Sequence, residues 1–222
     1  MVKRVTKNKE KKGRIKKDNV AILILTVILV ILLISIGVMT ANIFKKDKVE
    51  VKEVKIVDNI KNYGYSVTEN NTEYYKKLFD ELKDILKQDE VNEEEYAKKI
   101  AQLFVADFYD LNSKQSKNDV GGTQFVYASY KETFLKFATD SNGIYYYVQS
   151  NLYDDRKQTL PIVTEVTVTS ANKVSYNYNT LRDEEAYRVT LGVNYKTNLG
   201  YPKVVTVTLV HNEDKLEVVE MK

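Results

Sequence analysis

An uncharged apolar run at residues 20–44 (VAILILTVILVILLISIGVMTANIF) constrains the fold of this chain more than any other stretch. Its only polar residues are Thr26, Ser35, Thr40 and Asn42. About 20 helical residues, each rising 1.5 Å, span the roughly 30 Å hydrocarbon core of a bilayer. Because aliphatic side chains occur on every face, a helix here has no polar side to turn toward water. The run predicts one transmembrane helix in contact with membrane lipid.

Two other interpretations of this run are a cleaved signal peptide and a buried helix of a soluble protein. A signal peptide has an apolar region of about 7–15 residues and ends in small residues of the Ala-x-Ala kind. This run is longer, and its end at residues 39–44 (MTANIF) matches that pattern poorly. The sequence therefore favours a retained membrane anchor.

The segments that flank the run differ in charge. Residues 1–19 contain nine lysines and arginines and two acids, whereas the lysines of residues 45–55 alternate with Asp47, Glu50 and Glu53. Strongly positive flanks stay on the cytoplasmic side of a membrane. We therefore expect a single-pass protein of the cell membrane, with a basic cytoplasmic tail (residues 1–19) and an extracytoplasmic C-terminal part.

Composition excludes several kinds of site and partner. The chain has no cysteine, which rules out disulfides, thiolate nucleophiles and zinc–cysteine sites. No nucleic-acid partner is expected, because the basic tail lacks interleaved aromatic residues and residues 45–222 are net negative. No cofactor or metal is expected either, since glycine-rich phosphate loops and regularly spaced carboxylates are both missing from the sequence.

Residues 45–69 are expected to form a juxtamembrane stalk, whose first part could continue the transmembrane helix or pair as a strand. Residues 70–222 are expected to form a folded domain that begins with three helices. Apolar residues three and four apart predict helices over 73–88, 93–111 and 124–139. Asn70 or Thr72 can cap the first helix and Asn92 the second. In the third helix we expect five side chains to point inward: Tyr127, Tyr130, Phe134, Phe137 and Ala138. Residues 144–152 are ambiguous between helix and strand, with helix favoured.

After Pro161 the sequence alternates between apolar and polar residues, as strands do. Strands are predicted over residues 162–170, 173–180, 186–197, 203–211 and 215–221. The turns between them are short, which favours antiparallel neighbours. The predicted fold is therefore α+β: after the transmembrane helix, about three helices pack on a curved antiparallel sheet of four or five strands.

Residues 127–134 (YASYKETF) and the order of helices before a four-stranded meander carry a resemblance to known families. Residues 70–222 resemble the cone-shaped domains of the nuclear-transport-factor-two superfamily. With its single anchor, the chain also resembles the bitopic scaffold subunit of bacterial type IV secretion and conjugation channels. The Asn-Pro-x-Gly turn of the Gram-negative members is replaced here by residues 198–202 (NLGYP). The resemblance implies a scaffold role in an envelope complex.

Side chains suited to catalysis are few. His211 ends a predicted strand beside a polar turn, where we expect it in solvent. Asp107 and Asp110 lie on the second predicted helix, and Asp107 borders its apolar face. We expect Asp107 on a solvated helix face, with a place in a pocket as the alternative. We assign no catalytic, cofactor-binding or metal-binding residue.

Three consecutive tyrosines, Tyr145, Tyr146 and Tyr147, cannot all point inward, and exposed tyrosines are frequent at contact surfaces. We predict a protein contact there. The first functional hypothesis is a membrane-anchored scaffold that binds other envelope proteins or a second copy of itself. The alternative is a tethered ligand-binding domain or enzyme that uses the cone cavity. A third hypothesis is a regulator that senses outside and signals through the tail.

Overall fold

The computed structural model describes residues 28–29, 32 and 54–222. The chain divides into two compact units, Met1–Lys52 and Glu53–Lys222. The predicted transmembrane helix and basic tail lie, apart from residues 28, 29 and 32, outside the described residues. In the described part of the chain, no helix has both the length and the apolar character needed to cross a bilayer.

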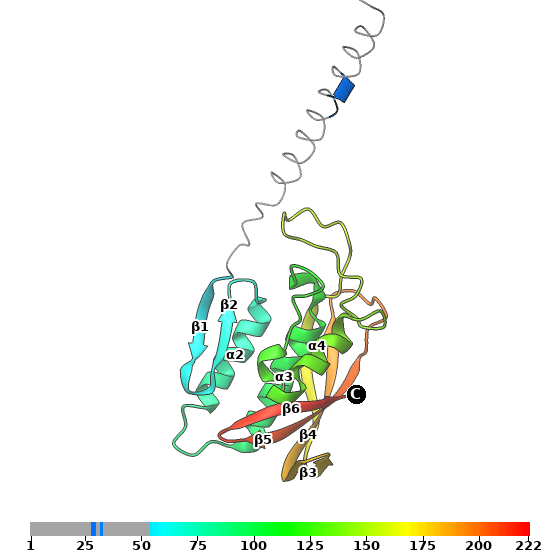
Figure 1. Ribbon diagram of the computed structural model, residues 1–222. Coiled ribbons are helices and arrows are strands. Elements are labelled where there is room, and N and C mark those ends of the chain that lie inside the picture. The colour runs from blue at the N-terminus through cyan, green and yellow to red at the C-terminus, as the bar shows by residue number, and fades with distance from the viewer. Residues whose placement is uncertain (1–27, 30–31, 33–53) are drawn as a thin grey trace, which may run out of the picture. The chain divides into compact units, whose positions relative to one another are not determined.

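The second unit is an α+β domain, which confirms the predicted fold class (Figure 1). A two-stranded hairpin comes first, followed by three α-helices and then by a four-stranded antiparallel sheet. The bounds are β1 Ile56–Ile60, β2 Tyr65–Thr68, α2 Glu73–Ile85, α3 Glu93–Tyr109, α4 Lys131–Thr139, β3 Val163–Tyr178, β4 Leu181–Tyr195, β5 Val204–Asn212 and β6 Lys215–Met221.

Side-chain caps fix the starts of α2 and α3 where the sequence predicts them. The Thr72 hydroxyl accepts the backbone N–H of Tyr75 at 3.1 Å, and the Asn92 side chain accepts that of Glu95 at 3.1 Å. Three glutamates in the first turn of α3 suit the positive end of the helix dipole. Both helices end two or three residues earlier than predicted, which is the ordinary uncertainty at frayed helix ends.

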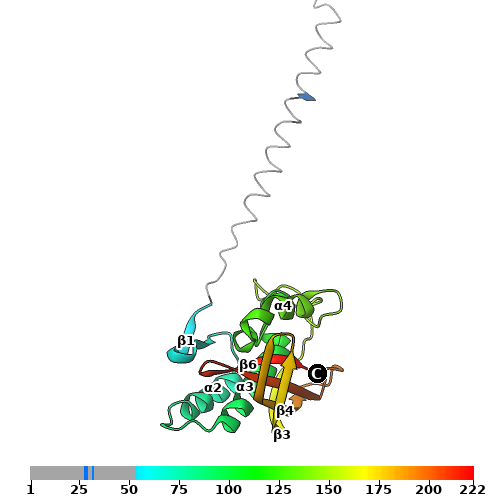
Figure 2. The ribbon, with the colours of Figure 1, turned by 60° about the horizontal axis from the view of Figure 1, so that its bottom comes forward.

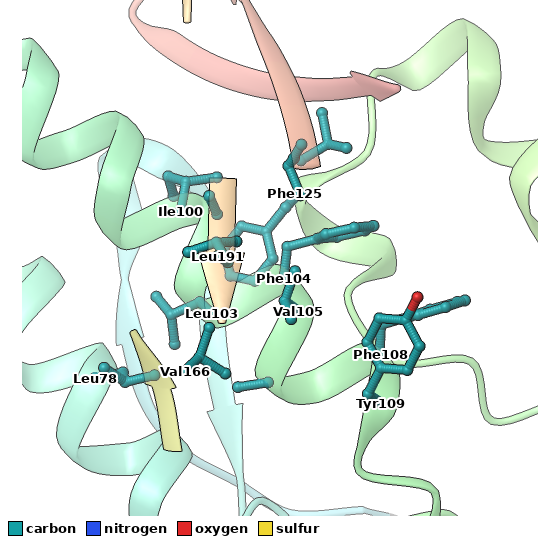
Figure 3. Packing of buried hydrophobic residues seen from close by; sticks show 14 of the residues in the cluster. Leu78, Ile100, Leu103, Phe104, Val105, Phe108, Tyr109, Phe125, Val166 and Leu191 are labelled. Carbon is teal, nitrogen blue, oxygen red and sulfur yellow. The ribbon is translucent and has the colours of Figure 1, made fainter. Parts of the chain in front are cut away.

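The helix α3 forms the centre of the domain. Its apolar side chains Ile100, Leu103 and Phe104 are almost completely buried in one cluster with Leu191 of β4 (Figure 3). Burial of each such side chain contributes about 1.5–3 kcal/mol to folding. The space between α3 and the sheet is therefore filled by side chains.

The sheet has the strand order β3-β4-β5-β6, with every pair antiparallel. In Figure 2, β3 and β4 run nearly across the direction of β5 and β6, which reflects a strong twist. The two predicted strands over residues 162–170 and 173–180 are in fact one strand, β3. Register shifts after Val168 and Val174 bend this strand without interrupting it, because a bulge adds twist while pairing continues.

The folded domain begins earlier than the predicted boundary at residue 70. Residues 54–69, expected as the end of a stalk that could pair as a strand, form the hairpin β1–β2, and Tyr65 and Val67 of β2 are buried in the core. The Gln124 side chain accepts the backbone N–H of Ser66 at 2.9 Å and donates to its carbonyl at 3.1 Å. The hairpin is thus part of the domain.

The predicted third helix, residues 124–139, is correct only in its second half. Residues Thr123–Phe125 and Ala128–Tyr130 form two 3-10 turns, and α4 begins at Lys131. The backbone N–H of Tyr127 donates to the carbonyl of Val218 in β6 at 2.9 Å. Pairing with this strand keeps Val126 extended, which prevents a continuous helix. Residues 144–152 form turns, so the helix favoured there is wrong.

Candidate functional site

An open groove of about 600 Å³ lies between α4 and the sheet. Most of the large side chains that line it are aromatic, and they come from α3, α4, the preceding 3-10 turn and the end of β3. The aromatic residues are Phe104, Tyr130, Phe134, Phe137, Tyr176 and Tyr178. A hollow of this size and chemistry is suited to a large apolar ligand or to the side chains of another protein.

The wall formed by α4 is only half covered by its own domain. Phe134 packs against Phe104 and Phe108 of α3, with ring centres 5.7 and 5.4 Å apart. Phe137, predicted to point inward, is 71% exposed, although Ala138 in the same turn of α4 is buried, so Phe137 lies off the buried face of the helix. This ring is a large apolar surface that nothing in the described part of the chain buries.

The end of β3 forms the opposite wall. Tyr178 packs edge-to-face on Tyr130, with ring centres 6.3 Å apart, and remains 57% exposed. Burial and the neighbouring Tyr130 hydroxyl raise the pKa of Tyr176 to about 12. Tyr176 therefore stays neutral at physiological pH and adds no anionic charge to the groove.

The edge strand β6 provides the floor. Its neighbour in the sheet is β5, and on its other side Val126 and Tyr127 contact it at Val218. Beyond that contact, Val219, Glu220 and Met221 continue along the groove. An edge strand beside apolar pockets is the arrangement that binds extended peptides by strand addition.

A buried ion pair holds the segment that leads into the groove. The Lys114 ammonium contacts one oxygen of Asp107, and the other oxygen accepts the backbone N–H of Gly122 at 2.7 Å. Lys114 is only 5% exposed, and Asp107, expected on a solvated helix face, is largely buried. Gly122 has a φ of +75°, and a Cβ there would lie 2.7 Å from the ring of Phe104. This pair is a structural clamp, since both of its charges are satisfied within it.

Asp110 ties α3 to the sheet. It is buried, and its carboxylate accepts the backbone N–H groups of Ser113 and Val163, each at 3.2 Å. Burial raises its pKa, against the opposing influence of Lys114 and these two hydrogen bonds. Val163 begins β3, so Asp110 positions the strand whose far end forms one wall of the groove.

His211, expected in solvent, is half buried in a polar cluster. Its Nδ1 lies 2.9 Å from Asp183, and the same carboxylate oxygen accepts its backbone N–H at 2.7 Å. Its Nε2 lies 3.6 Å from a carboxylate oxygen of Glu93, at the start of α3. Sequence reasoning missed the cluster because Asp183 is 28 residues away along the chain. An imidazole oriented by a carboxylate is suited to proton transfer or to holding three elements together.

The three consecutive tyrosines differ in burial, as expected from the sequence. Tyr145 is fully buried, and its hydroxyl donates to the carbonyl of Phe108 at 2.7 Å, so its ring is not available to a partner. Tyr146 and Tyr147 are exposed. Their contact with a partner protein stays a prediction. Among the described residues, no group of three or more His, Asp and Glu side chains is arranged to hold a metal ion.

One family model matches part of the chain. Its description is "Domain of unknown function (DUF8220)", and it covers residues 51–140. The match includes the hairpin, all three helices and the Asp107–Lys114 pair, and it ends before the sheet. No curated protein and no solved structure matches the chain. The start of the match at residue 51 agrees with the hairpin being part of the domain.

Proposed function

We propose that this protein is a membrane-anchored scaffold whose extracytoplasmic domain binds an extended apolar segment of another envelope protein in the aromatic groove. The observation that carries the proposal is that two exposed rings, Phe137 and Tyr178, line the same groove as the edge strand β6. Rings provide burial for large side chains at alternate positions, and the strand provides backbone hydrogen-bonding groups. A second copy of this chain is an alternative occupant.

The anchor itself is proposed on sequence grounds. The uncharged run at residues 20–44 is long enough to span a bilayer, and the basic residues 1–19 favour a cytoplasmic amino terminus. Protease treatment of intact cells tests both points. We expect the C-terminal domain to be digested and the lysine-rich tail to be protected; the reverse pattern would place the domain inside the cell.

The resemblance to bitopic scaffold subunits leads us to propose that the complex is a conjugation or type IV secretion channel. Its support is the order of three helices before a four-stranded meander, on a chain with one apolar run. Deletion of the gene should then lower the frequency of conjugative transfer, and the full chain supplied from a plasmid should restore it.

Site-specific crosslinking in the native membrane tests the groove. A photoreactive phenylalanine is placed at Phe137 or Tyr178, and at Leu199, an exposed apolar residue in the β4–β5 turn, as the matched control. We expect discrete adducts to one partner segment from the two groove positions and none from position 199. A synthetic peptide of that segment should bind the full chain, and Tyr178→Ser should weaken this binding at least tenfold. Peptide binding that Tyr178→Ser leaves unchanged would contradict the proposal.

The alternative, a tethered ligand-binding domain or enzyme, is supported by a second hollow of about 430 Å³ beside His211, lined also by Tyr63, Tyr96 and Lys215. A fragment library screened by ligand-observed NMR separates the two functions. A ligand lost in His211→Gln but retained in Phe137→Ser would favour this alternative.

A further inference from the structure

A second exposed apolar surface lies on the loop between α4 and β3. We define the tyrosine loop as residues 146–153, which contain four exposed large side chains: Tyr146, Tyr147, Leu152 and Tyr153. Tyr147 is 71% exposed and Tyr153 is 68% exposed. Single apolar residues are ordinary on protein surfaces, but four within eight residues indicate a contact surface.

Hydrogen bonds hold this loop in shape. The Arg156 guanidinium donates to the carbonyls of Lys114 and Asn112 at 2.7 and 2.6 Å. The Gln158 side chain accepts the backbone N–H of Gln149 at 2.9 Å and donates to the carbonyl of Tyr147 at 2.9 Å. Tyr145, directly before the loop, is fixed in the core, where its hydroxyl donates to the carbonyl of Phe108. The exposed rings are therefore presented by a fixed loop.

The tyrosine loop and the start of β1 lie at the same end of the domain (Figure 1). Val54, the first described residue of the domain, lines a hollow of about 310 Å³ together with Lys114 and Val120. Residues 114–120, which include Lys114 and Val120, also contact the loop, because the backbone N–H of Asn151 donates to the carbonyl of Gln115 at 2.8 Å. Val54 and the loop are thus separated by one short segment.

The length of the connecting chain limits how far this end can lie from the bilayer. Nine residues, 45–53, join the predicted membrane helix to Val54. Even fully extended, they reach about 30 Å. Tyrosine is enriched where proteins meet the headgroup region, because its ring is apolar and its hydroxyl is polar. The short connecting chain and the tyrosine side chains therefore both favour membrane lipid as the partner of the tyrosine loop.

Charges near the loop are balanced. The Lys117 ammonium lies 5.6 Å from the centre of the Tyr146 ring, and Lys157 is exposed nearby. Asp154 and Asp155 directly follow Tyr153. With both signs present, attraction to anionic lipid is not required, so the contact depends on burial of the rings in the interface.

We propose that the tyrosine loop rests in the headgroup region of the membrane that anchors this chain, and so fixes the orientation of the domain above the bilayer. This inference rests on the proposed anchor. A partner protein bound to the same rings is the competing outcome.

The absence of tryptophan from the chain permits a direct test. A single reporter is introduced by Tyr147→Trp or Tyr153→Trp in the full chain, reconstituted in phosphatidylcholine vesicles. The control is Glu90→Trp, an exposed position just before α3, because the 17 residues of that helix separate it from the loop end by about 25 Å. With brominated phosphatidylcholine, we expect the loop reporters to be quenched at least twofold more strongly than the control.

Two results would overturn the inference in distinguishable ways. If the chain stays in the vesicles at alkaline pH but the loop reporters are quenched no more than Glu90→Trp, the anchor stands and the lipid contact is wrong. If alkaline treatment releases the chain, the anchor and the inference fail together. A loop reporter shielded from aqueous acrylamide only when other membrane proteins are present would identify a protein contact and would also overturn the proposal.

Discussion

Asp107 and Lys114 lie on α3 and on the segment after it, and they form an ion pair that is almost out of reach of water. A buried pair contributes little net stability relative to apolar side chains, but its two halves depend strongly on each other. The pair also holds Gly122, so it fixes the chain that leads to the groove. The role of a charged residue such as Asp107 depends on the groups that surround it in the fold, and a single sequence does not reveal these groups.

Replacement of Lys114 by methionine should therefore be costly. Lys114→Met leaves the Asp107 carboxylate buried without a counter-charge, and we expect the free energy of unfolding to fall by about 3 kcal/mol. The matched control is Lys87→Met, which removes an exposed pair with Asp84 and should cost less than about 1 kcal/mol. Urea denaturation of the full chain in detergent, followed by circular dichroism, measures both. Equal costs would show that Lys114 is not the clamp.

Asp183 should make the domain sensitive to acid. Burial alone would raise the pKa of Asp183, but the hydrogen bonds from the backbone and ring of His211 hold this pKa below its usual value. A carboxyl with a lowered pKa in the folded state stabilises the fold above its unfolded pKa of about 3.9. That contribution disappears as the pH falls through the folded pKa.

Asp183→Asn tests this prediction. The variant should be less stable than the natural chain at pH 6, and the difference should shrink as the pH is lowered toward 3. Urea denaturation at each pH measures the difference, with Asp155→Asn, an exposed loop carboxyl, as control. A difference that stays constant over this range would contradict the assigned role of the carboxylate.

At the scale of elements, some apolar side chains of α4 pack against the core, whereas others are exposed at the groove. Phe134 contacts two rings of α3, whereas Phe137, one turn later, is mostly in solvent. We expect Phe134→Ala to lower the free energy of unfolding by about 2 kcal/mol, because it removes partly buried ring area. Phe137→Ala should change it by less than about 0.5 kcal/mol while weakening partner binding.

The two variants are compared by urea denaturation and by binding of the partner peptide identified through crosslinking. If Phe137→Ala destabilises the domain as much as Phe134→Ala, then its ring belongs to the core and the groove is narrower than described. If it affects neither stability nor binding, the groove is not the contact.

Elements with strong local signals were predictable from the sequence. Thr72 and Asn92 cap their helices, and β6 has the predicted bounds, because caps and the polar turn before β6 depend only on neighbouring residues. The third helix was not predictable, since its first half is held open by Val218, about ninety residues later in the chain. The groove depends on that same long-range contact, and for this reason the sequence did not indicate it.

For the whole molecule, the position of the domain boundary determines which fragment of the chain can fold by itself. Tyr65 of β2 is buried, and its hydroxyl lies 2.8 Å from that of Tyr96 on α3. A fragment of residues 53–222 keeps the complete compact unit and should fold cooperatively. A fragment of residues 70–222, which follows the boundary predicted from sequence, loses Tyr65, Val67 and the backbone partner of Gln124.

We expect the shorter fragment to be at least about 3 kcal/mol less stable, because it exposes the apolar surface that two core side chains cover. Denaturant unfolding of both fragments provides the comparison, with near-ultraviolet circular dichroism of the tyrosines as a measure of tertiary packing. A fragment of residues 61–222 separates the contribution of β1 to stability from that of β2, because it removes β1 and keeps β2. It should lie closer in stability to the longer fragment, because the buried side chains of the hairpin belong to β2. Equal stability of all three would show that the hairpin is an appendage of the domain and that residue 70 is the true boundary.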